Sequence, residues 1–465
     1  MSERKEKTAR GKEVNLGEGS VGRLLFRLAL PAITAQIINL LYNLVDRIYI
    51  GHLPGIGAEA LTGVGVTLPV ILAISAFAYL FSTGGAARAS IMMGRQKKEE
   101  AERIMGNCAA ALIAAAVVLT VFFLVFGRQI LLLFGASERT IGYAWDYMKI
   151  YSLGTIFVQI ALGLNYFINA QGYATMGMLT VIIGAGTNII LDPILMFGFD
   201  MGVQGAALAT IISQGLSAAW ILIFLSSRRS FLKLKLCNLR ISPAILAPCI
   251  ALGASPFVMQ FTESILNICF NVSLRAYGGD IAVGVMAVLS SVMQFALLPI
   301  TGMTQGSQPI VSYNYGAGKL DRVRSAFFNL LKCSVAYAVI LWALAMLFPQ
   351  IFMHMFTTDQ KYIAMGTWAM RVYTAGICVM GVQYACQQTF VALGNARTSL
   401  CLALLRKVIL LIPLIFILPH ILTDHKVFAV FLAEPVADIL AAATTAALFF
   451  RYLKKIMKSG GKQKG

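Results

Sequence analysis

The stretch Val181-Ile-Ile-Gly-Ala-Gly-Thr-Asn188-Ile-Ile-Leu-Asp192-Pro-Ile-Leu-Met-Phe197 is an apolar segment that carries an acid. Asn188 and Asp192 are four residues apart, so in a helix they share one face. A carboxylate near the middle of a bilayer-spanning helix costs about 2.5–3.5 kcal/mol on insertion scales, and such residues usually have a function. A second acid, Asp46, ends the apolar run Leu41-Tyr-Asn-Leu-Val-Asp46. The sequence therefore predicts a membrane protein with two buried acids.

Composition supports this class of protein. Of the 465 residues, 58% are hydrophobic and 12% are charged, whereas soluble domains carry about 25% charged residues. A helical span needs about 20 apolar residues, and twelve such segments are centred near residues 35, 72, 115, 155, 185, 214, 257, 293, 336, 378, 408 and 438. The first twenty residues are polar and contain no apolar run, so we expect no cleavable signal peptide.

The net charge of +18 is distributed unevenly between the predicted loops. With both termini on one side, that side holds 27 Lys and Arg residues and the other holds five. This asymmetry follows the positive-inside rule and places both termini in the cytoplasm. We therefore expect a multi-pass protein of the inner (plasma) membrane, whose basic loops contact membrane lipids and not nucleic acid.

The two halves of the sequence match each other at a shift of 222 positions, which becomes 225 at their fronts. The matching pairs are Gly94-Arg-Gln-Lys97 with Gly316-Ala-Gly-Lys319, Gly154 with Gly376, and Leu30-Pro31 with Ser255-Pro256. Six spans per half is an even number, so the halves are parallel repeats related by an axis along the membrane normal. The expected fold is all-α, with twelve transmembrane helices in two six-helix lobes. This architecture is typical of alternating-access transporters.

We divide the chain at the predicted span ends. The segments are an N-terminal cytoplasmic tail (1–20), an N-lobe (21–227), a cytoplasmic inter-lobe loop (228–242), a C-lobe (243–453) and a basic cytoplasmic tail (454–465). The repeat exposes an asymmetry in polar residues: Asp46 corresponds to Asn271, Asn188 to Leu410, Asp192 to Leu414 and Thr210 to Leu432. Polar chemistry confined to one half of a duplicated scaffold predicts a specialised ion site in the N-lobe.

Asp46, Asn188, Asp192 and Thr210 come from spans 1, 5 and 6, and Tyr42 lies one turn before Asp46. Their carboxylate, amide and hydroxyl oxygens suit a proton or Na⁺ as coupling ion. Burial and a neighbouring like charge both favour the protonated carboxyl, so the acids could load and release a proton near neutral pH. The structural alternative is an ion pair of Asp46 with Arg47 or Lys149, with Asp192 capping a kink at Pro193.

A second polar stripe lies in span 7, where Glu263 is followed by Asn267 and Asn271 at helical spacing. If the stripe faces a central cavity, the acid would attract small organic cations; helix packing is the alternative. Further candidates for the substrate site are Asn165, Met259 and Met293, because methionine side chains adapt to varied ligands. Glu434 and Asp438 in the last span are weaker candidates, because that span is expected at the periphery.

Enzymatic chemistry has no sequence support. The chain has no phosphate-binding P-loop, no nucleophile elbow and no prenyl-diphosphate motif. The eight cysteines form no disulfide pattern, and the histidines show no metal-ligand spacing apart from His425 beside Asp424. We expect no cofactor beyond the coupling ion, no metal other than Na⁺, and a monomer.

Nearly the whole chain resembles the multidrug and toxic compound extrusion (MATE) family. The resemblance rests on Pro31, Tyr42-Asn-Leu-Val-Asp46 and Gly51, on Gly184 with Asn188-Ile-Ile-Leu-Asp192-Pro193, on Gly205-Ala-Ala-Leu-Ala-Thr210, and on Gly94 with Gly316. The motifs of spans 5 and 6 resemble its DinF-like bacterial branch, while Glu263 resembles the span-7 acid of the NorM-like branch. The resemblance implies export of organic cations by antiport with H⁺ or Na⁺, and an ion site at Asp46, Asn188, Asp192, Thr210 and Tyr42.

The alternative function is that of a lipid-linked oligosaccharide flippase of a related fold. Its anionic substrate would need a basic cavity. The bases within or near spans are Arg47, Lys149, Lys332, Arg371, Arg406 and Lys407. Most lie near predicted span ends, where long basic side chains can reach the membrane surface. A third class, a passive channel or receptor, predicts transport that is independent of an ion gradient.

Overall fold

The computed structural model describes residues 15–356 and 359–461, and every regular element in these ranges is helical. Ten of its helices are long and apolar enough to span a membrane, and the α5–α6 pair, bent by 59°, makes an eleventh span. The helix α9 has 74 residues, about 110 Å at 1.5 Å per residue, far more than a bilayer core of about 30 Å. It consists of two helices joined at Gly279. The prediction of twelve spans is confirmed.

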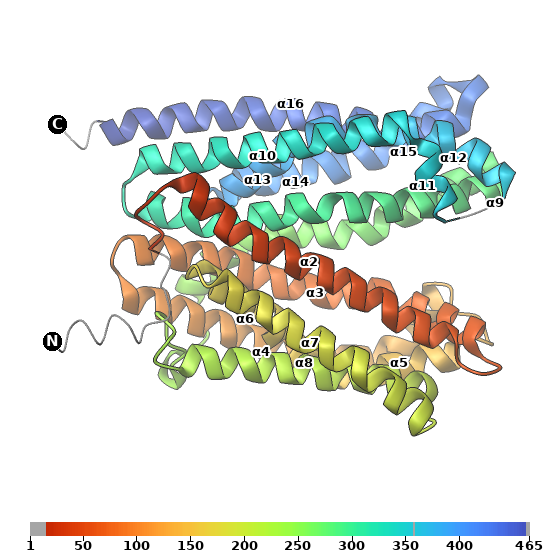
Figure 1. Ribbon diagram of the computed structural model, residues 1–465, viewed down its shortest axis with the longest axis horizontal. Coiled ribbons are helices and arrows are strands. Elements are labelled where there is room, and N and C mark those ends of the chain that lie inside the picture. The colour runs from red at the N-terminus through yellow and green to blue at the C-terminus, as the bar shows by residue number, and fades with distance from the viewer. Residues whose placement is uncertain (1–14, 357–358, 462–465) are drawn as a thin grey trace.

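The first six spans form the N-lobe and the next six the C-lobe (Figure 1). The N-lobe elements are α2 (Val21–Gly51), α3 (Gly57–Gly94), α4 (Lys98–Leu133), α5 (Ile141–Leu153), α6 (Thr155–Ala170), α7 (Ala174–Pro193), η1 (Ile194–Gly198) and α8 (Gly202–Ser226). The C-lobe elements, after the short η2 (Leu236–Asn238), are α9 (Pro243–Gly316), α10 (Leu320–Leu347), α11 (Pro349–His354), α12 (Gln360–Tyr373), η3 (Thr374–Gly376), α13 (Ile377–Ala392), α14 (Ala396–Leu404), η4 (Leu405–Leu411), α15 (Ile412–Ile421), η5 (Thr423–His425) and α16 (Lys426–Gly461). Within the segment expected to be a basic tail, residues 454–461 continue α16; residues 1–14 and 462–465 of the two tails lie outside the described residues.

The fourth span of each half breaks at its matched glycine. Gly154 separates α5 from α6, and a Cβ there would collide with the side chain of Ile211. In the second half η3 ends at Gly376, where a Cβ would lie 3.0 Å from the Cα of Pro435. A side chain at either glycine would push the bent span away from its neighbour. The sequence repeat therefore marks a bend that both lobes share.

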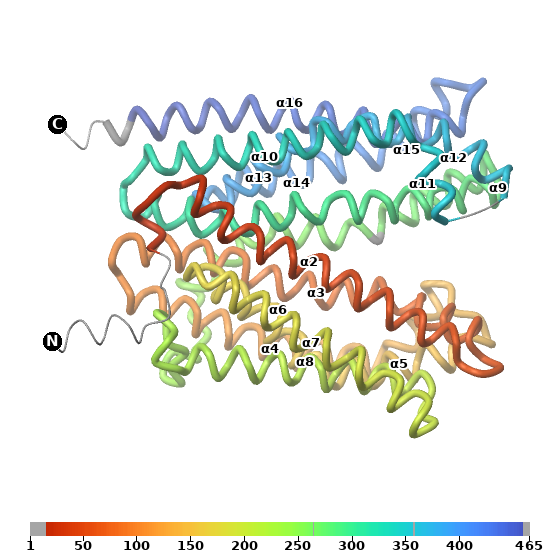
Figure 2. The backbone as a smooth tube through the Cα atoms, in the orientation of Figure 1, coloured from red at the N-terminus to blue at the C-terminus, as the bar shows by residue number. Residues whose placement is uncertain are grey.

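The two lobes converge at one end of the bundle and diverge toward the other (Figure 2). The first residues of α2 and the last of α16 both lie at the converging end, together with the loops 95–97 and 317–319 (Figure 1). Here the matched glycines Gly94 and Gly316 face the opposite lobe. A Cβ on Gly94 would meet the backbone carbonyl of Tyr313, and one on Gly316 would meet that of Ile91. We call this convergence the closed end.

The chain that enters span 1 is held at the closed end by the C-lobe. Arg322 on α10 donates to the carbonyl oxygens of Gly19 (2.7 Å), Glu18 (3.0 Å) and Leu16 (3.4 Å). Lys319 donates to the carbonyl of Gly17 across 2.9 Å. These charge-assisted bonds fasten the start of the N-lobe to the opposite lobe.

The N-lobe holds the inter-lobe loop in a similar way, but the side chain that does so is an acid instead of a base. Glu102 on α4 accepts from the backbone N–H of Lys233 (3.1 Å) and from Lys235 Nζ (2.6 Å), and the hydrogen bond and charge of Glu102 raise the pKa of Lys235. The Asn107 side chain accepts from the N–H of Ser242, just before α9. Each lobe thus holds the segment that enters the first span of the other lobe.

Candidate functional site

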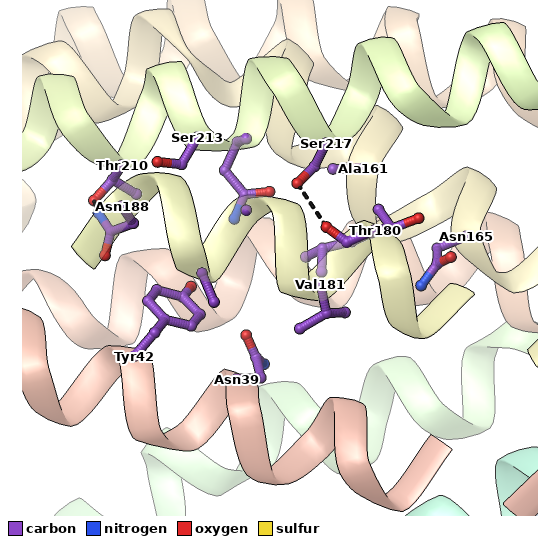
Figure 3. A pocket seen from close by; sticks show the side chains of 14 residues that line it. Asn39, Tyr42, Ala161, Asn165, Thr180, Val181, Asn188, Thr210, Ser213 and Ser217 are labelled. Carbon is purple, nitrogen blue, oxygen red and sulfur yellow. Dashed lines mark hydrogen bonds between the residues drawn. The ribbon is translucent and has the colours of Figure 1, made fainter. Parts of the chain in front are cut away.

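A small pocket lies inside the N-lobe between α2, α6, α7 and α8 (Figure 3). Its volume is about 50 Å³. One water needs about 10–15 Å³ measured in this way, so the pocket suits an ion with a few waters and not an organic molecule. Figure 3 shows Tyr42 and Asn39 on α2 pointing toward α7, with Asn188 and Thr210 side by side at one end.

Small residues bring α7, η1 and α8 close together around this pocket. A Cβ on Gly205 would meet the carbonyl of Leu195 in η1, and one on Gly184 would lie 2.6 Å from Ser217 Oγ. Ser217 donates to the carbonyl of Thr180 across 3.0 Å. Pro193, which lacks an N–H, ends α7 where the wider π-helical turn of η1 begins. The motifs singled out in the sequence therefore shape the pocket.

Asn188 connects the polar residues of spans 5 and 6. Its Nδ2 donates to Asp192 Oδ1 at 3.1 Å and lies 3.5 Å from Thr210 Oγ1. Thr210 itself donates to the carbonyl of Ala206. Asn188, Asp192 and Thr210 are all buried. The amide thus presents its hydrogen-bond donor to the acid.

Three buried oxygens in this region have no protein donor, namely Asp46 Oδ1, Asn188 Oδ1 and Asp192 Oδ2. Of these three residues Asn188 lines the pocket, whereas Asp46 and Asp192 are not among its lining residues. Within the described ranges neither acid forms an ion pair, so the structural alternative, a pair of Asp46 with Arg47 or Lys149, is not seen. Tyr42 lines the pocket and lies on α2 one turn before Asp46. An unpaired buried acceptor is costly. These oxygens have the chemistry to bind a proton or Na⁺.

A second, larger cavity of about 480 Å³ lies between the lobes. Its volume falls in the range of about 300–1,000 Å³ that is usual for small-molecule sites. The candidates Glu263, Met259 and Met293 all line it. Asn165 instead lines the small N-lobe pocket and donates to the carbonyl of Gly177. Asn271 is exposed and lines neither cavity.

The C-lobe wall of the large cavity contains ion pairs that the sequence did not reveal. Lys407 Nζ lies 2.7 Å from Glu263 Oε2. Arg406 binds Asp438 Oδ1 (2.8 Å) and lies 3.6 Å from Glu434 Oε1. Both bases stand on the π-helical segment η4 in the middle of span 11.

The bases and acids of this wall correct one sequence expectation. Arg406 and Lys407 are buried inside the C-lobe, where Asp438 and Glu263 on two other helices pair with them. The last span does not lie at the periphery at this level, because Glu434 lines the cavity and Asp438 is buried beside it. The sequence showed the acids and the bases, but 32 and 144 residues separate the partners.

Among the described residues, no cluster of three or more His, Cys, Asp or Glu side chains could hold a metal ion. The acids of the N-lobe could share a Na⁺ with side-chain amide, hydroxyl, backbone carbonyl or water oxygens. Asn188 Oδ1 has the required free acceptor.

Two parallel lobes of six spans around a central cavity define a multi-pass membrane transporter. The chain belongs to the MatE family, whose sequence profile matches residues 31–194 and 256–417. The two matches begin 225 residues apart, the shift that aligns the fronts of the two halves.

Curated relatives and solved structures agree with this assignment. The multidrug export protein MepA of Staphylococcus haemolyticus is 25% identical over 425 residues, which cover 91% of this chain and 93% of that protein. MepA of Staphylococcus aureus strain NCTC 8325 is 25% identical, with 86% and 87% covered. The same fold occurs in a multidrug resistance MATE family transporter of the MOP superfamily in its outward-facing conformation, with a TM-score of 0.89, 22% identity, and 96% of this chain and 99% of that chain covered. It also occurs in a MOP superfamily transporter from Pyrococcus furiosus, with the same TM-score, identity and coverage.

Proposed function

We propose that this chain is a secondary active multidrug exporter that moves small organic cations outward in exchange for H⁺ or Na⁺. The observation that carries the proposal is the set of buried oxygens without protein donors at Asp46, Asn188 and Asp192. A coupling ion bound there would satisfy them.

The sizes of the two cavities suit two different ligands, the coupling ion and the substrate. The N-lobe pocket of about 50 Å³ has room for an ion at Asn188, the hydrogen-bond partner of Asp192, although neither acid lines the pocket itself. The inter-lobe cavity of about 480 Å³ has room for the substrate. Met259, Met286 and Met293 give the large cavity an adaptable apolar wall. The export of multiple drugs, which the name of MepA states for that relative, would require such a wall.

Alternating access is supported by the contact between the lobes. Gly94 and Gly316 let the two backbones meet at the closed end. The positive-inside rule assigns this end, with both termini, to the cytoplasm. In the described conformation the cavity is therefore separated from the cytoplasmic side, as expected after an exporter has carried its substrate across the membrane. We propose that the protein works as a monomer in the plasma membrane.

The flippase alternative is less well supported by the charges of the cavity. The two bases among its described lining residues, Arg406 and Lys407, are both paired with acids. The wall therefore has no excess positive charge for an anionic lipid-linked sugar.

The test is transport of a fluorescent cation such as ethidium in everted membrane vesicles under an imposed pH or Na⁺ gradient. We expect uptake into the vesicles that stops when the gradient is collapsed. Uptake that does not depend on either gradient would contradict antiport and support a passive channel.

A further inference from the structure

We propose that Lys407 is an intramolecular counter-ion of Glu263, the cation-binding acid of the inter-lobe cavity. A cationic substrate must displace Lys407 to reach this acid. The proposal rests on the proposed function for its substrate class, organic cations. Under this proposal, Lys407 determines how tightly the inter-lobe cavity binds a cationic substrate.

The geometry separates Glu263 from the other charged groups of the wall. The Glu263 side chain is 48% exposed because it faces the cavity, whereas its partner Lys407 is 7% exposed. A cation entering the cavity thus meets the acid, but the Lys407 ammonium already lies 2.7 Å from its Oε2. The protein supplies its own cation at the position that a substrate would take.

The number of acids and bases around the cavity determines how strongly the Lys407–Glu263 pair affects a cationic substrate. The charged residues among the described lining are two acids, Glu263 and Glu434, and two bases, Arg406 and Lys407. Arg406 is buried and also bonded to Asp438 outside the cavity lining. With Lys407 in place, the wall offers little net negative charge to a monovalent cation.

Lys407, unlike Arg406, has the means to move. It forms one hydrogen bond to one acid through a flexible four-carbon chain, whereas Arg406 is fixed between two acids. Glu434 lines the same cavity as Lys407, and its contact with Arg406 is long at 3.6 Å. In this proposal Glu434 receives the ammonium when a substrate cation takes its place on Glu263.

The experiment measures binding of tetraphenylphosphonium, whose charge does not depend on pH, to purified protein without an ion gradient. Lys407→Met should lower the Kd at least about tenfold, a change of about 1.4 kcal/mol. Lys407→Arg keeps the counter-ion and should bind no more tightly than wild type. The matched control Lys332→Met removes an exposed lysine of α10 and should leave the Kd unchanged.

A second variant tests whether the gain in affinity requires the carboxylate of Glu263. In the double variant Glu263→Gln/Lys407→Met neither charge remains, so the gain in affinity should disappear. Binding of uncharged triphenylphosphine oxide should differ little among all variants.

Three results would overturn the proposal: an unchanged or higher Kd in Lys407→Met, tighter binding in Lys407→Arg, or a double variant that keeps the full gain. If Lys407→Met does not fold, tighter binding than wild type by either Lys407→Arg or the double variant still overturns the proposal. The proposed function fails on a different result, namely a wild-type protein that binds the cation but shows no gradient-driven transport.

Discussion

Asn188 donates a hydrogen bond to Asp192, one helical turn further along α7, with 3.1 Å between Nδ2 and Oδ1. The bond uses one acid oxygen and leaves Oδ2 without a donor. It holds the carboxylate in place while keeping one oxygen available, which is the arrangement expected of a site that binds and releases an ion.

The amide of Asn188 should therefore be required for coupling. In Asn188→Leu, neither oxygen of Asp192 has a donor, so we expect export driven by a gradient to fall at least about tenfold. The unfolding free energy should fall by about 1–3 kcal/mol, the cost of a buried group left without a partner. The matched control is Ser213→Ala in the same pocket, since Ser213 bonds only to the carbonyl of Ala209 in its own helix. Equal transport by both variants would contradict the role of Asn188.

The glycine contact at the closed end should tolerate no side chain. Gly94→Ala and Gly316→Ala each place a methyl group against a backbone carbonyl of the opposite lobe. Overpacking of this kind costs about 1–3 kcal/mol, so both variants should unfold at lower temperature than wild type in detergent. Gly186→Ala is the control, because a Cβ at this helical glycine meets nothing within 4 Å. If all three alanines have the same effect, the lobes do not meet as described.

The contact of Arg322 with the chain that enters span 1 should contribute substantially to stability. Arg322→Gln loses charge-assisted bonds to three carbonyl oxygens, and we expect a loss of about 1.5–3 kcal/mol. Thermal unfolding in detergent measures it. The exposed Arg451 gives the control Arg451→Gln, which should change stability by less than about 0.5 kcal/mol. Similar losses in the two variants would show that the contact is not maintained in solution.

The Glu102–Lys235 pair predicts a dependence on alkaline pH. Glu102 raises the pKa of Lys235, so the stabilisation is fully present below the unfolded-state pKa of lysine and is lost as the pH rises through the higher folded-state pKa. The difference in unfolding temperature between wild type and Lys235→Met should therefore be the same at neutral and at mildly alkaline pH. It should shrink only when the pH rises above the ordinary pKa of lysine, about 10.4. A difference that disappears between neutral and mildly alkaline pH would contradict this assignment.

Much of the fold could be predicted from the sequence because hydropathy and an internal repeat report on it directly. Twelve apolar segments gave the spans, and the repeat paired Gly154 with Gly376, whereas the bend of the fourth span at these glycines became visible in the structure. The residues Asn188, Asp192 and Thr210 could be grouped because helical spacing and adjacent spans bring them together.

The C-lobe wall could not be predicted in the same way. Lys407 and Glu263 stand on different helices 144 residues apart, and neither spacing nor the repeat indicates that they pair. The bases also stand on a π-helical segment, which changes the direction of side chains relative to a regular helix. For Asn271 the sequence predicted a grouping that the structure does not show. Its spacing in span 7 grouped it with Glu263, but Asn271 is exposed and lines neither cavity.

The central claim is that the N-lobe acids couple an ion to the substrate, and the affinity for ethidium measured across pH and Na⁺ concentration tests it most directly. Ligands that favour different states must weaken each other reciprocally, so wild-type affinity should fall as pH drops or as Na⁺ rises. In Asp46→Asn/Asp192→Asn this dependence should largely vanish while the protein stays folded, because the amides keep the shape and remove the ion site. A double variant that retains the full wild-type dependence on pH and Na⁺ would place the coupling site elsewhere and contradict the account.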